Sequence, residues 1–302
     1  MRHAAPVAIF AALALIGVLG AHLPGIVPLI VSRIMIFAIA AISLDLIMGI
    51  GGLPSFGHAA PLTIGAYAVA VLDVAGVRDA AVVVPAAVIA AGLFALATGA
   101  VALRTRGVNF IMITLAFAQM VYFGAGSLSD YGGDDGYTLF ARTKVFGLNL
   151  LGERTIYATT FTVLLATYLL LRVIAASRFG RALSAIRQNR ARAQALGIDA
   201  FAIELTALVI AAMIAAVAGV LMANQAEFVS PAYAAWGRSG GLMVMVILGG
   251  LGTLHGAILG AAIVVLAEEG LGAFTQHWPL ALGPFLVLAV LFFRHGIVGA
   301  RR

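Results

Sequence analysis

Residues 177–198 read Ser-Arg-Phe-Gly-Arg-Ala-Leu-Ser-Ala-Ile-Arg-Gln-Asn-Arg-Ala-Arg-Ala-Gln-Ala-Leu-Gly-Ile, and an apolar run over residues 201–223 follows. Residues 177–198 contain many arginines, and their apolar residues recur at helical spacing at Leu183, Ile186, Ala193 and Leu196. This pattern predicts an amphipathic basic helix that stops at Gly197, because glycine accepts the left-handed conformation that ends helices. The apolar run is long enough to cross a bilayer. A basic interfacial helix therefore leads into a membrane span.

The composition places the whole chain in a membrane. Of its 302 residues, 63% are hydrophobic and only 10% are charged, which is too few charges for a water-soluble domain of this length. The apolar runs approach 20 residues and lack the alternation of barrel strands. The chain has no cysteine, which excludes disulfides, thiolate metal sites and cysteine nucleophiles. We expect an all-α, polytopic transmembrane helical bundle.

The apolar runs predict about ten membrane crossings within a single domain over residues 1–302. The first is interpreted as an uncleaved span, with a cleavable signal peptide as the alternative. Basic residues concentrate on the side that carries residues 177–200, so this side and both termini are predicted to be cytoplasmic. The expected spans cover residues 1–24, 30–48, 61–74, 80–103, 110–126, 156–174, 201–223, 240–251, 257–267 and 278–293.

Two interpretations of the basic segment compete. It could be a positively charged loop that only sets topology, or a docking element for a cytoplasmic partner. Residues 178–198 follow the pattern Arg-Phe-Gly-Arg-Ala-Leu-x-Ala-Ile-Arg-x-Asn-x-x-x-Ala-x-x-Leu-Gly-Ile, which resembles the coupling segment of ABC-transporter permeases of branched-chain amino-acid importers. The resemblance implies a cytoplasmic coupling helix over residues 177–200. The residues that it assigns to ATPase coupling are Arg178, Phe179, Gly180, Arg181, Ala182, Leu183, Ile186, Arg187 and Gly197.

A glycine-rich stretch at residues 49–58 breaks the helical pattern between two apolar runs. It could be an ordinary cytoplasmic turn, or irregular backbone beside a translocation path, where protein or water must surround it. It resembles the family's Gly-x-x-Gly-x-x-Ser-Phe-Gly-His-Ala motif, and residues 114–119 and 249–256 resemble two further family motifs. Polar groups in such spans more often pair between helices than bind substrate. The implied path residues are Ser55, Phe56, Gly57, His58, Thr114, Gln119, Gly249, Gly250 and Gly252.

Residues 127–155 form the longest polar stretch. Its aspartates could suggest calcium, but no spaced acidic ladder ending in a bidentate glutamate follows, so a turn-rich outer loop is the better interpretation. The family's Gly-Gly-x-Asp-Gly pattern is matched here. The resemblance makes the loop a contact for an external binding protein, through Gly132, Gly133, Asp135 and Gly136.

The sequence lacks the chemistry of an ATPase. A Walker A motif needs a lysine after a glycine-rich loop, whereas the only lysine, Lys144, stands between Thr143 and Val145. No catalytic triad, metal motif or paired catalytic carboxylates appear, so we expect no catalytic residues, no metal site and no cofactor in this chain. An ion-coupled carrier would embed several carboxylates along its path. Only Asp45 and Glu204 are expected to be buried, and both are near the inner ends of their spans.

The resemblance implies a permease subunit of an ATP-driven ABC importer in a bacterial inner membrane. Its substrates would be leucine, isoleucine and valine, or related small polar molecules. The implied partners are a second related permease, one or two cytoplasmic ATPase subunits that hold ATP and magnesium, an extracytoplasmic substrate-binding protein and membrane lipid, but no nucleic acid. The alternative is a self-sufficient ion-coupled carrier or channel.

Overall fold

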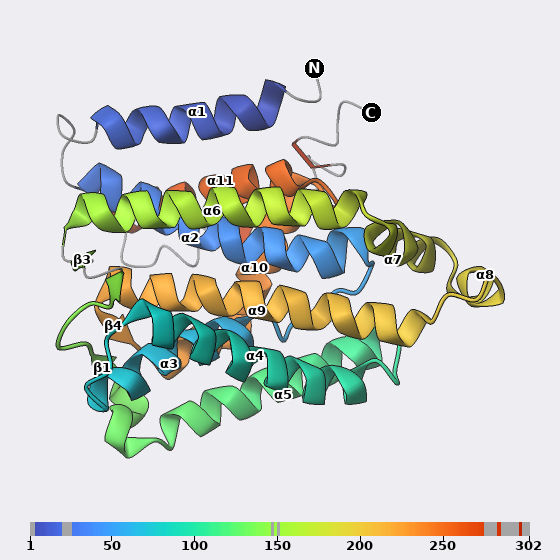
Figure 1. The fold of residues 1–302 in the computed structure, drawn as a ribbon, viewed down its shortest axis with the longest axis horizontal. Helices are drawn as coiled ribbons and strands as arrows, with labels where there is room; N and C mark the ends of the chain where they lie inside the picture. Colours follow the sequence, from blue (N-terminus) through green and yellow to red (C-terminus); the bar gives the residue numbers. More distant parts are fainter. Residues whose placement is uncertain are drawn as a thin grey trace.

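The computed structural model describes residues 4–19, 26–145, 148–149, 152–274, 283–284 and 296–297 as a bundle of roughly aligned helices (Figure 1). The predicted all-helical class is confirmed, and the strands that are present have only two residues each. The elements are α1 (Ala4–Leu19), α2 (Ile26–Asp45), η1 (Leu46–Ile50), α3 (Ala59–Val74), α4 (Ala80–Ala102), α5 (Val108–Gly126), η2 (Ser129–Tyr131), η3 (Gly133–Asp135), β1 (Tyr137–Thr138), β2 (Lys144–Val145), β3 (Leu148–Asn149), α6 (Glu153–Ala176), α7 (Arg178–Gln188), α8 (Arg190–Ala195), α9 (Ala200–Ala226), β4 (Phe228–Val229), η4 (Pro231–Ala234), α10 (Trp236–Gly249) and α11 (Leu254–Phe274).

The number of full-length spans is smaller than predicted. In the part of the chain that the structure describes, 6 helices are long and apolar enough to cross a membrane: α2 continued by η1, α4, α5, α6, α9 and α11. The apolar helices at Pro6–Val18 and Ala59–Val74 are shorter, and α10 has only 14 residues. The count of ten is therefore wrong for these residues. The expected last span, residues 278–293, lies outside the described residues except for 283–284.

Helix α2 is the centre of the bundle. Its residues from Met35 to Leu44 are buried on every side, which fits a helix that is apolar all round. Helices α6, α9, α10 and α11 pack around it. By contrast, α4 and α5 expose large apolar side chains such as Leu93 and Phe123, as expected for helices that face lipid.

Glycines let several helix backbones touch. A Cβ atom at Gly65 of α3 would collide with the carbonyl oxygen of Ala216 on α9, and one at Gly219 of α9 would collide with that of Leu62 on α3. The backbones of α3 and α9 therefore approach each other closely, as small residues allow.

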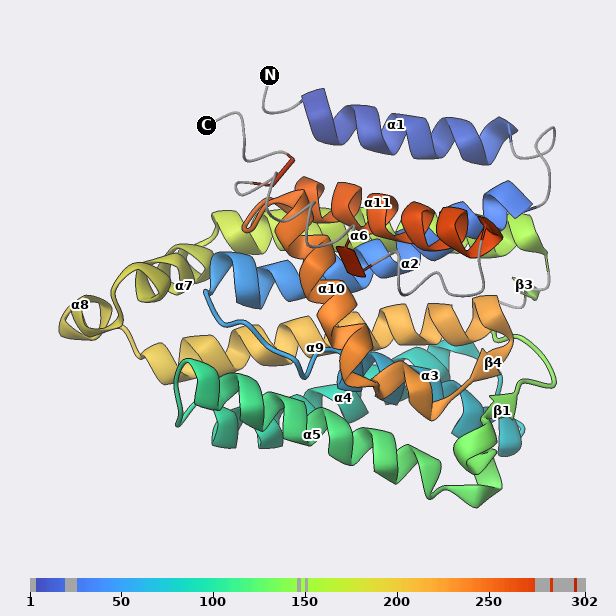
Figure 2. The same cartoon turned by 180° about the vertical axis from the view of Figure 1, so that it is seen from behind.

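The two polar segments of the chain lie at opposite ends of the bundle. Strand β1 pairs antiparallel with β4 through Tyr137 and Val229, and β2 pairs with β3 near the same end. Helices α7 and α8 project beyond the other end (Figures 1 and 2). We call these the β1 end and the α8 end. The predicted outer loop and coupling segment are therefore separated by the length of the bundle.

Candidate functional site

Residues 51–58 form an irregular segment inside the bundle. Figure 2 shows this segment running back from the α8 end toward the middle of the molecule, where α3 begins at Ala59. Helix α3 is short, about 24 Å at 16 residues, because the irregular segment occupies the rest of that depth. The predicted break is present, but it begins at Gly51, since residues 46–50 continue α2 as a π-helical turn.

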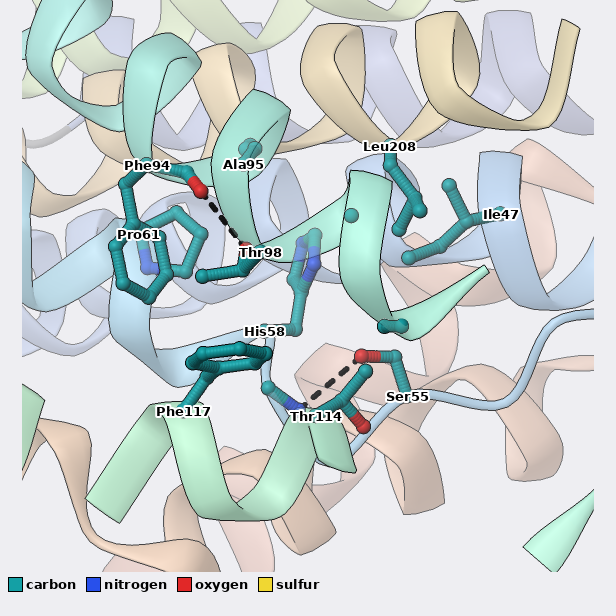
Figure 3. A pocket seen from close by; sticks show the side chains of 14 residues that line it. Ile47, Ser55, His58, Pro61, Phe94, Ala95, Thr98, Thr114, Phe117 and Leu208 are labelled. Carbon is teal, nitrogen blue, oxygen red and sulfur yellow. Dashed lines mark hydrogen bonds between the residues drawn. The ribbon is translucent and has the colours of Figure 1, made fainter. Parts of the chain in front are cut away.

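A cavity opens beside this segment. It holds about 460 Å³ including the open space at its mouth, and residues of η1, α3, α4, α5 and α9 complete its wall. Four of the predicted path residues line it: Ser55, Gly57, His58 and Thr114 (Figure 3). The remaining wall is mostly apolar, with Phe94, Phe117 and Leu208 among its larger side chains. A mostly apolar wall with a few polar groups is typical of small-molecule sites.

His58 is held by hydrogen bonds that the sequence did not reveal. Its side chain is buried, and Nε2 lies 2.8 Å from Ser43 Oγ on α2. The Ser43 hydroxyl has one proton, which it donates to the carbonyl oxygen of Ala40 at 2.8 Å, so the imidazole Nε2–H donates to Ser43. Ser239 of α10 accepts a hydrogen bond from the backbone N–H of Ala59 at 3.1 Å. The start of α3 is thus anchored to both α2 and α10.

The other predicted path residues lie away from the cavity. The ring of Phe56 faces α10, where a Cβ at Gly240 would lie 3.6 Å from its Cε1 atom. Gln119 is a half-buried residue on α5 that does not line the cavity. Gly249 is the last residue of α10, and Gly250 and Gly252 belong to the turn between α10 and α11 at the α8 end. The structure therefore splits the predicted path into two groups.

The second group forms a junction beneath α7. The Gly252 N–H donates to Asp45 Oδ1 at 2.7 Å, and the Arg187 guanidinium donates to the Gly49 carbonyl oxygen. Gly52 has φ +72°, and a Cβ there would lie 2.7 Å from Arg187 Cγ. We call this set of residues, Asp45, Gly49, Gly52, Arg187 and Gly252, the glycine junction. It joins α7 to the end of α2 and to the α10–α11 turn.

The basic segment is two helices instead of the single one predicted. Helix α7 ends at Gln188, because the next residue, Asn189, has a φ of −160° and a ψ of 102°, which are not helical. The Asn189 side chain caps α8 by accepting from the Arg192 N–H at 2.9 Å. Asparagine competes with the helical backbone in this way. Gly197 has φ +82°, so the predicted stop is confirmed. Leu196 is 75% exposed, so its predicted place on the packed face is wrong.

The chain turns from α6 into α7 at Ser177, and Gly180 of α7 lies against the end of α6. A Cβ at this position would collide with the carbonyl oxygens of Ala175 and Ile174, and the Gly180 N–H donates to Ser177 Oγ at 3.3 Å. Leu183 and Ile186 are buried, as their spacing predicted. Arg181 is exposed, and its guanidinium caps the end of α6 by donating to the Ala176 carbonyl oxygen at 2.7 Å. Arg178 and Arg192 are also exposed.

A buried carboxylate connects α8 to the bundle. Glu204 of α9 is 1% exposed and accepts two hydrogen bonds from Arg106, both at 3.0 Å. Arg190 of α8 lies 3.0 Å from Glu204 Oε2 on the other side. Sequence reasoning expected Glu204 to be buried near the inner end but missed both arginines. They lie about 98 and 14 residues away along the chain, and opposite charges near one membrane side were the only available signal.

The polar loop at the β1 end is held by one aspartate. Asp73 is buried, and it accepts from Arg78 Nε at 2.5 Å, the Tyr137 hydroxyl at 3.1 Å and the Phe140 N–H at 3.2 Å. Burial and this hydrogen bond raise the pKa of Tyr137. Asp135 is exposed.

The predicted glycines of this loop are required by its turns. Gly132, Gly133 and Gly136 have φ values of 89°, 52° and 85°, which side chains with a Cβ rarely adopt. Within the described ranges, no three His, Asp or Glu side chains come together as a metal site.

Irregular backbone at membrane depth is tolerated where protein or a cavity surrounds it, and this arrangement fits a membrane permease. Comparison with known families agrees. The family model described as "Branched-chain amino acid transport system / permease component" matches residues 26–294, and the chain belongs to this family. The predicted family resemblance is confirmed, and the chain is a multi-pass membrane permease component.

Individual relatives carry the same description. The chain is 27% identical over 297 residues to the high-affinity branched-chain amino acid transport system permease protein LivM of Salmonella typhimurium, covering 90% of this chain and 70% of that protein. It is 28% identical to LivM of Escherichia coli K12, covering 89% and 69%. It is 29% identical to BraD of Pseudomonas aeruginosa, covering 87% and 91%. No solved structure matches the chain.

Proposed function

We propose that the chain is a permease subunit of an ATP-driven importer in a bacterial inner membrane, and that it carries branched-chain amino acids. Membership of the permease family and relatives named for high-affinity branched-chain amino acid transport support this role. ATP and magnesium would bind to cytoplasmic ATPase subunits. A second related permease would complete the membrane part, since LivM and LivH of Salmonella typhimurium are both relatives.

The single observation that supports the coupling role is the way α7 and α8 are attached. They project from the bundle and expose Arg178, Arg192 and Leu196, which a partner protein can contact. At the same time they are bound to the bundle through the glycine junction and through Glu204. A segment that is exposed to a partner and fastened to the spans is suited to transmit movement.

The two attachments lead to different parts of the transport machinery. Glu204 connects α8 to Arg106, which lies just before α5, and α5 carries Thr114 of the cavity wall. The glycine junction connects α7 to the α10–α11 turn and to η1, next to the segment of residues 51–58. Movement of the docked helices would thus reach both sides of the cavity.

The β1 end is the proposed contact for an external binding protein. Asp130, Asp134 and Asp135 are exposed on the loop there, and the loop conformation is fixed by Asp73 and by its positive-φ glycines. A rigid, acidic surface can select a basic surface on the binding protein. Both termini would lie on the cytoplasmic side, as the basic residues predict.

The experiment is co-purification of the chain with the candidate ATPase and second permease, followed by uptake into vesicles. Arg192→Glu together with Leu196→Glu should abolish recovery of the ATPase and ATP-dependent uptake of L-leucine. Arg154→Glu, at the exposed start of α6 at the opposite end, serves as the matched charge reversal and should change neither. Wild-type recovery of the ATPase by the double variant would contradict the docking role.

Uptake into the same vesicles also tests the alternative function, a self-sufficient ion-coupled carrier. If the chain alone, without ATPase subunits, drove uptake from an ion gradient, it would be a self-sufficient carrier.

A further inference from the structure

A cluster of charged side chains lies between α2, α10 and α11, apart from the cavity. Arg33 of α2 makes ion pairs with both Glu268 and Glu269 of α11, the first at 3.5 Å. The guanidinium of Arg238 on α10 lies 5.3 Å from the ring centre of Phe37, and that of Arg33 lies 5.9 Å from the same ring. We call these four charged residues and Phe37 the charged cluster.

The charged cluster is at membrane depth. Arg33 follows the start of α2 by two turns, or about 10 Å, and Phe37 lies one further turn deeper. Glu268 and Glu269 precede the end of α11 by more than one turn. Both helices are candidate spans. Charged side chains within spans face protein or water instead of lipid, and they mark functional paths in transport proteins.

Arg238 has unused hydrogen-bonding capacity. Its side chain is only half-buried, and within the described part of the chain its guanidinium makes no hydrogen bond and no ion pair within 4 Å. The Phe37 ring is its close partner, and Glu268 is near enough to interact with it electrostatically. A guanidinium carries five N–H donors in a planar fork that matches a carboxylate. Arg238 is therefore positioned and available to bind one.

The two glutamates of the charged cluster are suited to the ammonium group of an amino acid. Two carboxylates share the single cation of Arg33, so they retain acceptor capacity for an ammonium group. The four charges of the cluster sum to zero, as do those of a zwitterion, so binding creates no uncompensated charge in the membrane. The cavity beside His58 is different, because no charged side chain lines it.

We propose that Arg238 and Glu268 form a binding site for the zwitterionic head group of an α-amino acid. Arg238 binds the carboxylate and Glu268 accepts from the ammonium group. This proposal rests on the proposed function and assigns its substrate class to a place. The face formed by α2, α10 and α11 at this depth then borders the translocation path instead of lipid, and substrate entering from the β1 end meets the charged cluster before it reaches the apolar cavity.

The test uses the complex of this chain with its partner subunits, without the binding protein, and measures ligand binding by saturation-transfer NMR. The probes are L-leucine, isopentylamine, which lacks the carboxylate, and 4-methylpentanoate, which lacks the ammonium group. Arg238→Gln should weaken L-leucine and 4-methylpentanoate at least about tenfold, because a charged hydrogen-bonded pair is lost, and leave isopentylamine unchanged. Glu268→Gln should weaken L-leucine and isopentylamine and leave 4-methylpentanoate unchanged.

Arg154→Gln is the matched control, since this arginine is exposed at the same end of the bundle, and it should alter the affinity for none of the probes. Basal ATP hydrolysis reports assembly of each variant. Wild-type affinity for L-leucine in Arg238→Gln, or equal losses for all three probes, would overturn the proposal in favour of a structural cluster.

If Arg238→Gln does not assemble, Arg238→Lys provides the test of the site. Lysine keeps the positive charge but lacks the planar guanidinium group, so L-leucine should bind several-fold more weakly. The affinity for isopentylamine should not change. Unchanged L-leucine binding to this variant overturns the site. A wild-type complex that binds L-leucine but does not import it contradicts the proposed function alone. A wild-type complex that binds neither L-leucine nor L-alanine overturns both the proposed function and the proposed binding site.

Discussion

Glu204 illustrates how one side chain can join three elements. It lies on α9, and it is bound by Arg106 from the α4–α5 connection and by Arg190 from α8. A buried carboxylate is costly unless it is paired, and here both carboxylate oxygens have cationic partners. The arginines reach outward to water while the carboxylate stays inside. The position of α8 therefore depends on a charge that is not part of α8.

Glu204→Gln keeps the size of the side chain and removes its charge, so both arginines lose their ionic partner. The attachment of α8 should weaken by about 1–3 kcal/mol, the scale of hydrogen bonds to charged groups. We expect the assembled complex to hydrolyse ATP while uptake of L-leucine falls about tenfold or more. Glu204→Asp, which keeps the charge, is the control. Normal coupling of uptake to hydrolysis in the Gln variant would show that Glu204 does not transmit movement.

Two glycines of the basic segment should respond differently to alanine. At Gly180 a Cβ collides with the backbone of α6, so α7 must move. At Gly197 a Cβ meets nothing within 4 Å, and the cost is only the left-handed conformation, about 1 kcal/mol. Gly180→Ala should therefore abolish ATPase binding, and Gly197→Ala should reduce it slightly, as measured by co-purification. Equal effects would contradict a packing role for Gly180.

At the scale of elements, the bundle depends on helices that touch backbone to backbone. The contact of α3 with α9 lies beside the cavity, because α3 starts at the irregular segment and both helices contribute residues to the cavity wall. Gly65 and Gly219 create this contact, one from each helix. A side chain at either position would push the two helices apart and widen the cavity.

Gly219→Ala should lower the thermal stability of the purified protein, because the new methyl group meets the Leu62 carbonyl oxygen, which belongs to a helix backbone and cannot move aside. Overpacking of this kind costs about 1–3 kcal/mol. The measurement is the apparent melting temperature in detergent. Gly237→Ala, where nothing lies within 4 Å, is the matched control and should leave it unchanged. A similar melting temperature for both variants would exclude the close α3–α9 contact.

At the scale of the whole molecule, the two ends expose different charged groups. The α8 end carries exposed arginines on α7 and α8, and the β1 end carries exposed aspartates on a rigid loop. Between them lie the charged cluster, the cavity and the glycine junction. The charged cluster lies nearer the β1 end, and the glycine junction lies beside α7 at the α8 end.

The orientation can be tested because the chain has no native cysteine. Asp135→Cys at the β1 end should react with a membrane-impermeant thiol reagent in intact cells, and Leu196→Cys at the α8 end should react only after the membrane is permeabilised. Both side chains are exposed, so access to the membrane side decides the outcome. The reverse pattern would place α7 and α8 outside the cell and contradict ATPase docking.

Local sequence patterns predicted much of the fold. Hydropathy alone determined the membrane class, helical spacing determined the buried positions of Leu183 and Ile186, and Gly197 marked a helix end, because each of these depends on neighbours within a few residues. Length counting gave too many full spans, because a run of apolar residues does not tell how much of the membrane depth irregular backbone occupies. Leu196 was misplaced for a similar reason, since Asn189 ends one helix and starts another.

The functional groups depended on distant partners, and only the tertiary structure brought these together. Ser43 pairs with His58, Glu204 pairs with Arg106, and Arg238 lies near Phe37 and Glu268. The members of each set come from separate segments of the chain, and the sequence around one residue does not indicate its partner. The sequence by itself determined which residues must leave water and which segment stays at the membrane surface. The packing of helices decided which buried polar groups meet, because a charge inside a membrane is stable only beside the particular group that compensates it.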